Sequence, residues 1–246
     1  MNVLGIIPAR FGSTRLEGKP LVDICGKPMI QRVYEQAKKA LDFVLIATDD
    51  ERIAKAVEGF GGQVVMTSAD HTTGTNRCLE AYEIFIKRTD TKFDVVLNIQ
   101  GDEPLLAPDQ IKSLVSCFED KETQLATLVI PTLKNEDLNT GVFVVFDKVF
   151  NAMYFSRSII PAVRDEQMDA WSKNHTFYKH VGMYGFTPKS LSEFAGLEQT
   201  PLEECEKLEQ LRWIENGNKI RVAITKHQSI PVDTAEDVER VRKMLS

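Results

Sequence analysis

Three cationic side chains lie close together near the start of the chain. Arg10, Arg15 and Lys19 belong to the stretch PARFGSTRLEGKPL (8–21), which also contains two glycines and two hydroxyl side chains. Glycine lets backbone N–H groups approach an anion, arginine forks onto phosphate oxygens, and lysine adds a compact charge. We therefore expect this stretch, called the cationic loop below, to bind phosphate. The alternative is a solvated basic loop. The stretch is neither a Walker A loop nor GxGxxG, which argues against an ATPase and a dehydrogenase.

Two aspartates that are far apart in the sequence are the candidate metal ligands. Asp102 directly follows an apolar, strand-like stretch, and Asp233 lies near the end of the chain. Magnesium takes oxygen ligands, commonly one or two carboxylates together with phosphate oxygens. Asp233 has an alternative role, because Asp233-Thr234-Ala235-Glu236 also has the spacing of a capping box.

Apolar strand patterns alternate with amphipathic helical patterns through the first half of the chain. The expected strands are 3–7, 43–48, 64–66, 93–99 and 126–131, and the expected helices are 29–40, 51–58, 75–88 and 108–118. This alternation predicts an α/β fold with a mostly parallel sheet sandwiched by helices. The cationic loop and Asp102 would then lie at the carboxyl ends of strands, where open α/β sheets bind ligands. Asp49 and Asp50 are expected to cap the helix that follows them.

The second half of the chain has a different pattern. It contains three β-prone stretches (141–146, 151–155 and 178–186) and a polar stretch (164–176). We expect antiparallel strands there, with a small excursion that could pair with a second subunit. The remaining expected elements are helices at 188–195, 202–216 and 235–245 and a strand at 220–225.

The composition is that of a globular protein without a general affinity for nucleic acid. The chain has 246 residues, with 30 Lys and Arg against 36 Asp and Glu, and a net charge of −6. A nucleic-acid-binding surface would show a basic excess, and this length fits one large domain. Four scattered cysteines without a CxxC pair indicate free thiols in a reducing cytoplasm. Neither a signal peptide nor a membrane-spanning run is expected.

The stretch IPARFGSTRLEGKPL (7–21) resembles the opening motif of the 3-deoxy-manno-octulosonate (Kdo) cytidylyltransferases. The likeness continues in order at ATDD (47–50), VMTSADHTTGTNR (65–77), NIQGDEP (98–104), YFSRSIIP (154–161), YKHVGMY (178–184), LEQLR (208–212) and VDTAED (232–237). The resemblance implies a Rossmann-like sheet of the nucleotide-diphospho-sugar transferase type, in a single domain over 1–246 with a sugar-binding and dimerisation subregion at 132–190. It also implies a cytoplasmic homodimer that uses Mg²⁺ and transfers CMP from CTP to an eight-carbon sugar acid for lipopolysaccharide biosynthesis, releasing pyrophosphate.

The resemblance distributes roles over the site residues. It implies catalytic roles for Arg10, Arg15, Lys19 and Asp102, and metal ligation by Asp102 and Asp233. It implies nucleotide contacts from Pro8, Ala9, Arg10, Ser13, Lys19, Thr67, Ser68 and Arg77. It implies sugar contacts from Arg15, Gln100, Arg157, His180, Tyr184, Glu209 and Gln210. Taken singly, His180 also fits a structural histidine, and Glu209 fits the solvated face of a helix.

One stretch departs from the family pattern. The family usually has an Asn-Pro-Asn element followed by a lysine, and the matching stretch here is LNTGVF (138–143). Thr140 stands at the position of the second asparagine, and Phe143 at that of the lysine. Loss of a cation favours a ligand that carries an ammonium group, because like charges repel. The acceptor expected from this departure is the 8-amino analogue, 8-amino-3,8-dideoxy-manno-octulosonate, with Kdo as the alternative.

Two other classes of protein remain as alternatives. A nucleotide-sugar-dependent glycosyltransferase shares nucleotide binding at the edge of an α/β sheet, but typically shows Asp-x-Asp after a strand. This chain has Asp102-Glu103-Pro104 at that place. A non-catalytic nucleotide-binding homologue is less well supported, because the cationic loop and both candidate metal carboxylates are present.

Overall fold

The structure is a computed structural model that describes residues 1–12, 15–132, 138, 140–228 and 230–245. The chain divides into two compact units, which are described separately below. The first comprises Met1–Lys112, Gly185–Ala195 and Ser229–Ser246, and the second comprises Ser113–Tyr184 and Gly196–Gln228. Three elements cross from one unit to the other along the chain: α4 (Pro108–Ser116), β10 (Phe177–Phe186) and α6 (Pro188–Gly196).

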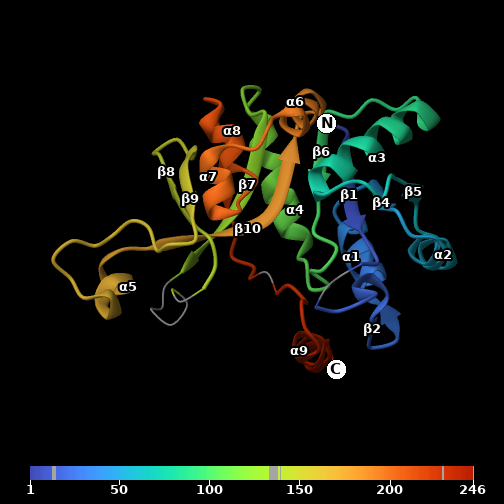
Figure 1. Cartoon of the computed structure of the whole chain (residues 1–246), viewed down its shortest axis with the longest axis horizontal. Helices are drawn as coiled ribbons and strands as arrows, with labels where there is room; N and C mark the ends of the chain where they lie inside the picture. The colour runs from blue at the N-terminus through green and yellow to red at the C-terminus, as the bar shows by residue number, and fades with distance from the viewer. Residues whose placement is uncertain (13–14, 133–137, 139, 229, 246) are drawn as a thin grey trace. The chain divides into compact units, whose positions relative to one another are not determined.

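A parallel sheet forms the centre of the first unit (Figure 1). Its strands are β6 (Val95–Asn98), β1 (Val3–Ala9), β4 (Phe43–Thr48) and β5 (Val64–Met66), in that order. The pairs β1–β6, β1–β4 and β4–β5 are all parallel. Their side chains are almost all apolar and buried, as expected for strands that are covered on both faces.

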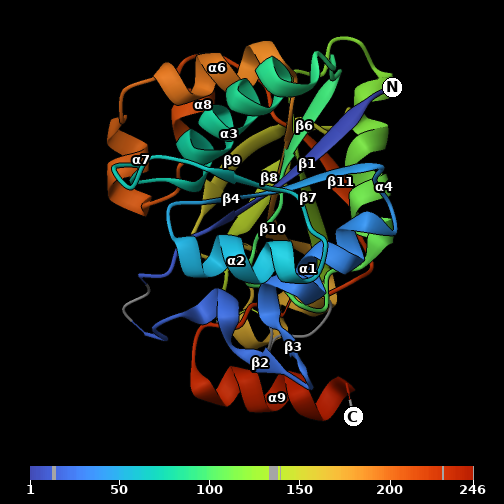
Figure 2. The same ribbon diagram turned by 90° about the vertical axis from the view of Figure 1, so that its right-hand side faces the viewer.

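Helices cover both faces of this sheet. The helices are α1 (Met29–Lys38), α2 (Glu51–Gly59) and α3 (Gly74–Thr89). Figure 2 shows α1 and α2 on one side of the strands and α3 on the other. Right-handed crossovers require this arrangement, because α3 leads from the edge strand β5 back past β4 and β1 to β6. The predicted α/β class with a mostly parallel, helix-covered sheet is confirmed.

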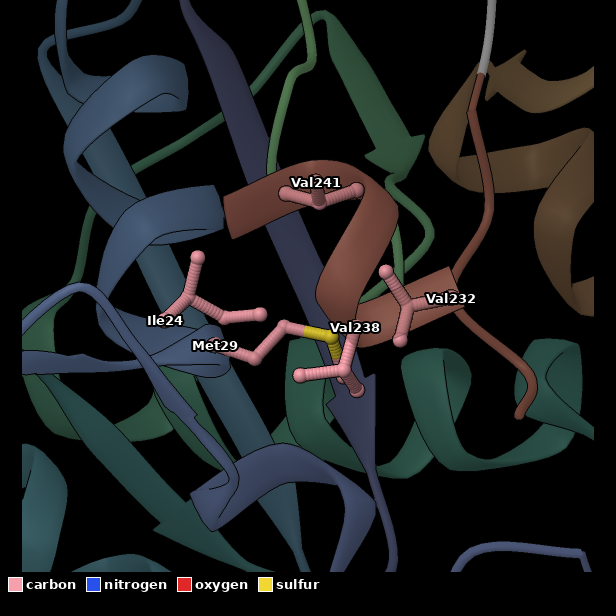
Figure 3. Packing of buried hydrophobic residues seen from close by; sticks show 5 residues of the cluster. All are labelled: Ile24, Met29, Val232, Val238 and Val241. Carbon is pink, nitrogen blue, oxygen red and sulfur yellow. The ribbon is translucent and has the colours of Figure 1, made fainter. Parts of the chain in front are cut away.

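A small apolar cluster joins the last helix to the start of the chain. Helix α9 (Ala235–Leu245) packs beside the short hairpin of β2 (Asp23–Ile24) and β3 (Lys27–Pro28). Figure 3 shows the buried side chains at this contact, which are Ile24, Met29, Val232, Val238 and Val241. The hairpin was not predicted, since its strands are only two residues long and its turn at Cys25-Gly26 needs two positive φ angles.

The second unit contains the antiparallel part of the fold. Its strands are β11 (Arg221–Ile224), β7 (Leu125–Thr132), β8 (Phe143–Phe146) and β9 (Ala152–Ser156), together with most of β10. Strands β11 and β7 are parallel, whereas β8 pairs antiparallel with both β9 and β10. The excursion predicted over 164–176 contains a helical turn at Met168–Ala170 and the short helix α5 (Trp171–Asn174).

The expected helix 202–216 is wrong, because two helices stand in its place. Helix α7 (Pro201–Glu206) ends at Lys207, which has a left-handed backbone (φ 53°), and α8 spans Leu211–Glu215. The guanidinium group of Arg157 donates to the carbonyls of Glu206 (2.6 Å) and Lys207 (3.3 Å), which supplies partners for carbonyls at the end of α7. Glu209 and Gln210 therefore lie in a turn rather than within a helix.

Other expectations were closer to the structure. Strand β1 continues through Pro8 to Ala9, beyond the predicted end at residue 7, and the strands 43–48 and 64–66 and the helix 235–245 have the predicted bounds. Within the described residues, no helix combines the length and apolar character that crossing a membrane requires. The single domain over 1–246 and its subregion 132–190 stay predictions.

Candidate functional site

A cavity of about 360 Å³ opens at the carboxyl ends of β1 and β6 in the first unit. Ligand sites in proteins commonly have volumes of roughly 300–1,000 Å³. Nine of the residues predicted for the site line it, namely Pro8, Ala9, Arg10, Arg15, Lys19, Arg77, Gln100, Asp102 and Asp233. Ser13, which was predicted to contact the nucleotide, lies outside the described residues.

Lys19 links the two aspartates across the cavity. Its Nζ donates to Oδ2 of Asp102 (2.6 Å) and to Oδ1 of Asp233 (2.9 Å). Arg15 Nη2 also reaches Oδ1 of Asp233, at 3.1 Å. Burial alone would lower the pKa of Lys19, but the charges and hydrogen bonds of the two carboxylates outweigh it and raise the pKa above its ordinary value. The ammonium group is therefore charged, and the remote aspartates lie side by side.

Backbone contacts fix the two aspartates beside each other. The N–H of Val232 donates to the carbonyl of Asp102 at 2.9 Å. Thr234 and Asp237 form a reciprocal cap at the start of α9: Thr234 N–H donates to Asp237 Oδ2, and Asp237 N–H donates to Thr234 Oγ1. The capping alternative for Asp233 is thus wrong. Because Thr234 caps the helix, the Asp233 carboxylate can point to the cations.

Three segments that contribute polar residues to the site pack against the apolar cluster of Figure 3. They are the cationic loop, the stretch after Asp102 and the stretch before α9. Leu16 from the cationic loop and Leu105, which follows Asp102, pack against it as partly buried side chains. Val232, next to Asp233, is one of its buried members. Burial of apolar surface therefore helps to bring together charged groups that would otherwise remain separately solvated.

The amino end of α3 provides a second wall of the cavity. Thr72, Thr73 and Gly74 line the cavity, and Thr73 caps α3 by accepting from the backbone N–H of Asn76 (3.2 Å). The unpaired N–H groups and the dipole of a helix favour an anion at its amino end. This end of α3 therefore adds anion-binding groups to those of Arg10, Arg15 and Lys19 in the same cavity.

Arg77 holds the predicted nucleotide residues in one hydrogen-bonded group. Its Nη1 donates to Thr67 Oγ1 (2.6 Å) and to the Ser68 carbonyl (3.3 Å), and its Nη2 pairs with Asp49 (2.8 Å). Asp50 caps α2 as predicted, by accepting from Arg52 N–H. The prediction that Asp49 is also a cap is wrong, since its carboxylate is used by the buried Arg77.

Two residues beside this group, His71 and Glu80, were not predicted as site residues. Glu80 accepts from the backbone N–H of Ser68 (2.8 Å) and lies 2.5 Å from Nε2 of His71, which lines the cavity. The hydrogen bond of Ser68 and the attraction of His71 lower the pKa of Glu80 although burial opposes them. The spacing between His71 and Glu80 crosses from a loop into a helix, so neither strand nor helix periodicity could have paired them.

Three residues predicted for the sugar form a connected chain in the second unit. His180 Nε2 lies 2.9 Å from Thr127 Oγ1, whose own hydroxyl is 2.8 Å from the carbonyl of Met183. The rings of His180 and Tyr184 are 5.3 Å apart, and the Tyr184 hydroxyl donates to Gln210 Oε1 at 3.0 Å. Since the single Thr127 hydroxyl proton goes to the carbonyl, the histidine donates through Nε2–H.

Burial keeps this chain of residues neutral. It lowers the pKa of His180 to about 3, and it raises the pKa of Tyr184, to which the charge of Glu209 adds. Gln210 is 2% exposed, and its amide nitrogen has no partner within the described residues. A buried donor without a partner costs free energy unless a ligand or water binds it. Among these three side chains, Gln210 is therefore the one most suited to donate a hydrogen bond to a hydroxyl or carboxylate of a ligand.

The other sugar candidates are in different places. Gln100 lines the cavity of the first unit. Arg157 is an exposed side chain in the second unit, where its guanidinium group donates to the end of α7. Glu209 lies in the turn before α8, next to Gln210.

The departure at Phe143 does not fall on the face that carries His180. Phe143 is 1% exposed, pairs with Lys179 across β8 and β10, and contacts the ring of Phe177. Lys179 Nζ lies 5.8 Å from the centroid of the Phe143 ring. Side chains alternate along a strand, so Lys179 and Phe143 share one face, and His180 and its neighbour Phe155 share the other. Asn139, in the same stretch, lies outside the described residues.

Two carboxylates and phosphate oxygens are a donor set that suits Mg²⁺. Asp102 and Asp233 fit this requirement, because oxygens of both lie within hydrogen-bonding distance of one atom, Lys19 Nζ. Among the residues that the structure describes, no group of three or more His, Cys, Asp or Glu side chains could hold a metal alone. The site therefore suits a cation that arrives with a phosphate-bearing ligand.

The fold places a cavity lined by Arg10, Arg15 and Lys19 at the carboxyl edge of a mostly parallel sheet, an arrangement typical of proteins that bind phosphorylated ligands. A family model described as cytidylyltransferase matches residues 4–220, and the chain belongs to this family. It is a nucleotidyltransferase that uses CTP. Family membership leaves the glycosyltransferase and the non-catalytic homologue without support.

Several relatives are similar to the chain over its whole length. A protein of Parabacteroides distasonis named 3-deoxy-manno-octulosonate cytidylyltransferase is 52% identical, and the alignment covers 100% of this chain and 99% of the relative. A protein of Shewanella putrefaciens named 8-amino-3,8-dideoxy-manno-octulosonate cytidylyltransferase is 46% identical, with the same coverage. A solved structure described as CMP:2-keto-3-deoxy-manno-octonic acid synthetase complexed with CTP is 36% identical, with a TM-score of 0.90, covering 100% of this chain and 98% of that one.

Proposed function

We propose that this cytidylyltransferase transfers CMP from CTP to the anomeric hydroxyl of an eight-carbon sugar acid of the Kdo class and releases pyrophosphate, for lipopolysaccharide biosynthesis. The observation that carries the proposal is the convergence of Lys19, Asp102 and Asp233 in one cavity. Relatives named for this activity, similar over their full length, support it.

Each charged residue has a role in this reaction. The oxygen of the sugar hydroxyl attacks the α-phosphorus, a new P–O bond forms, and the hydroxyl proton passes to solvent. The bond to the pyrophosphate oxygen breaks, and pyrophosphate leaves. Arg10, Arg15 and Lys19 stabilise the negative charge that grows on the leaving oxygens, because preformed positive charges need no rearrangement in the transition state. The amino end of α3 and Arg77, with Pro8, Ala9, Thr67 and Ser68, bind and orient the rest of the nucleotide.

Asp102 and Asp233 hold Mg²⁺ in this proposal. When bound, the ion neutralises phosphate charge and polarises the phosphate oxygens. With both carboxylates holding the ion, the Lys19 ammonium group would be available to bind the triphosphate. Lys19 thus acts as the internal counter-ion of the site until the substrate and the ion arrive.

We favour Kdo as the acceptor, with its 8-amino analogue as the second candidate. The electrostatic reason for the analogue was the loss of a lysine at Phe143, yet this side chain is buried on the face opposite His180, and Lys179 stands across from it. Gln100, His180, Tyr184, Glu209 and Gln210 remain the proposed sugar contacts, with Arg15 and Arg157 as cationic partners for the carboxylate.

The test is a panel of nucleotides and sugar acids, read by pyrophosphate release with and without Mg²⁺. We expect release with CTP and Kdo, and little with ATP, GTP or UTP. A catalytic efficiency at least tenfold higher with the 8-amino analogue than with Kdo would reverse our choice of acceptor. No release with either sugar acid would overturn the proposed function.

We also propose that the enzyme is a cytoplasmic homodimer. Val149, Phe150 and Met153, within the subregion 132–190, are large apolar side chains with exposed fractions of 59%, 44% and 62%, which is typical of an interaction surface. Four free thiols fit a reducing compartment. Sedimentation equilibrium and cell fractionation test the two statements, and a monomer that persists at micromolar concentrations would contradict the first.

A further inference from the structure

Phe11 lies inside the cationic loop, next to Arg10, and packs against the other end of the same loop. The backbone N–H of Gly18 donates to the Phe11 carbonyl at 3.1 Å. Gly18 has a φ angle of 65°, and a Cβ at this position would lie 3.0 Å from Phe11 Cζ. The Phe11 ring therefore fills the space beside the glycine and joins the two ends of the loop.

Arg52, in the first turn of α2, lies over the ring of Phe11. Its guanidinium carbon is 3.3 Å from the ring centroid, which is within the range of a cation–π contact. Asp50 fixes the guanidinium group, since Nε donates to Oδ1 (3.0 Å) and Nη2 donates to Oδ2 (2.7 Å). Glu17, also in the loop, adds an attractive charge beside Arg52. Through Phe11, Arg52 thus attaches both ends of the loop to α2. Asp50, which caps this helix, holds the Arg52 side chain in place.

Among the described residues of the loop, the ion pairs involve groups that take part in the proposed reaction. Arg15 and Lys19 are held by Asp233 and Asp102. Phosphate competes for these cations, and Mg²⁺ competes for these carboxylates, so the ion pairs cannot hold the loop once both are bound. The contact between Arg52 and Phe11 uses none of these groups, so neither phosphate nor Mg²⁺ competes for it.

We propose that Arg52 and Phe11 are positioning residues that hold the cationic loop against α2 while Arg15 and Lys19 bind the triphosphate. The proposal rests on the proposed function, because it assigns the loop to CTP. Arg52 acts through the loop rather than on the substrate, and its side chain is 61% exposed. Replacing it therefore leaves the core of the protein intact.

The test compares Arg52→Ala with Lys55→Ala, which removes another exposed cation from the same helix. Two quantities are measured: the KM for CTP from pyrophosphate release, and the hydrogen-exchange rate of the Gly18 amide in the enzyme without ligand. In Arg52→Ala we expect both to rise roughly two- to fivefold, as for loss of an exposed cation–π contact, with kcat changed less. Phe11→Leu, which removes the ring, should behave as Arg52→Ala.

The two readouts separate this proposal from the proposed function. If Arg52→Ala matches Lys55→Ala in both KM and Gly18 exchange, the positioning role is overturned. Faster Gly18 exchange with an unchanged KM also overturns it, because the loop would then be attached without any effect on CTP. If the wild type releases no pyrophosphate with any acceptor, KM is replaced by the Kd for CTP from calorimetry, and a matching rise in Kd and exchange still supports the role of Arg52.

Discussion

The two units hold their candidate residues in opposite electrostatic states. In the first, Lys19, Asp102 and Asp233 are charged, and their side chains are 15%, 25% and 33% exposed around a cavity. In the second, His180 and Tyr184 are half-buried and neutral, Gln210 is buried, and hydrogen bonds or ring contacts join the three in a row. The first arrangement suits stabilisation of changing charge on phosphates, and the second suits recognition of a ligand by fixed hydrogen bonds.

The same difference extends to the ion pairs. The pairs of Lys19 with Asp102 and Asp233 in the first unit can exchange partners, since they line an open cavity that water and ligands reach. The pair of Arg212 and Glu203 in the second unit is almost enclosed, with side chains 7% and 5% exposed, and it joins α7 to α8 just beyond the turn that carries Glu209 and Gln210. We infer that the charges of Lys19, Asp102 and Asp233 serve ligand binding, whereas the pair of Arg212 and Glu203 serves local structure.

The largest expected effect is a loss of stability when the structural ion pair of Arg212 and Glu203 is broken. Glu203→Ala leaves the Arg212 charge buried without its partner, and should lower the free energy of unfolding by about 3–5 kcal/mol in urea denaturation. The double variant with Arg212→Met should recover part of the loss, because it removes the unpaired charge. Glu204→Ala, at an exposed neighbour, is the control. A loss below about 1 kcal/mol would place this pair among the weak surface ion pairs.

The next effect tests the charged site. Lys19→Met removes the cation that meets both carboxylates, and should lower kcat by about 10²–10³-fold, as when one preformed donor to a transition-state charge is removed. Lys27→Met is the control, because Lys27 pairs with Glu35 instead. Circular dichroism checks that both variants are folded. Turnover within threefold of the wild type would exclude Lys19 from the phosphate site.

The smallest expected effect is the pH dependence of stability that arises from the neutral His180. The pKa of His180 is lowered to about 3 in the folded chain by burial, against 6.5 as its ordinary value. Below pH 6.5, His180 therefore takes up a proton in the unfolded chain, whereas in the folded chain it does so only near pH 3. The free energy of unfolding decreases as the pH falls through this window. The slope from this residue is at most roughly 1.4 kcal/mol per pH unit.

His180→Gln should remove that slope from the unfolding free energy measured between pH 6.5 and 4. His227→Gln, at an exposed histidine, is the control. An acid dependence that is the same in His180→Gln and in the wild type would show that His180 is not kept neutral by burial.

Much of the first unit could be predicted because each of its parts follows a local rule. Alternating strand and helix patterns gave the parallel sheet, and the sheet edge rule placed the cationic loop next to Asp102. The approach of Asp233 could not be derived from periodicity, since it depends on the packing of α9 through Val232, Val238 and Val241. The family resemblance supplied that approach without its physical cause.

The second unit was less predictable for a physical reason. Its turn at Lys207 contains neither glycine nor proline, so an amphipathic pattern continued through it and suggested one helix. The carbonyls at the end of α7 are satisfied by Arg157, which is distant in sequence. Similarly, only the strand register shows that Phe143 and His180 point to opposite faces. Tertiary contacts decided these features.

The most direct test of the charged site is a crystal structure of the chain with Mn²⁺ and a non-hydrolysable CTP analogue. We predict one or more anomalous peaks bound by the carboxylates of Asp102 and Asp233 together with phosphate oxygens, and Lys19 Nζ on the triphosphate instead of on the carboxylates. A nucleotide bound elsewhere, or a metal that touches neither aspartate, would contradict the assignment of this cavity to the reaction.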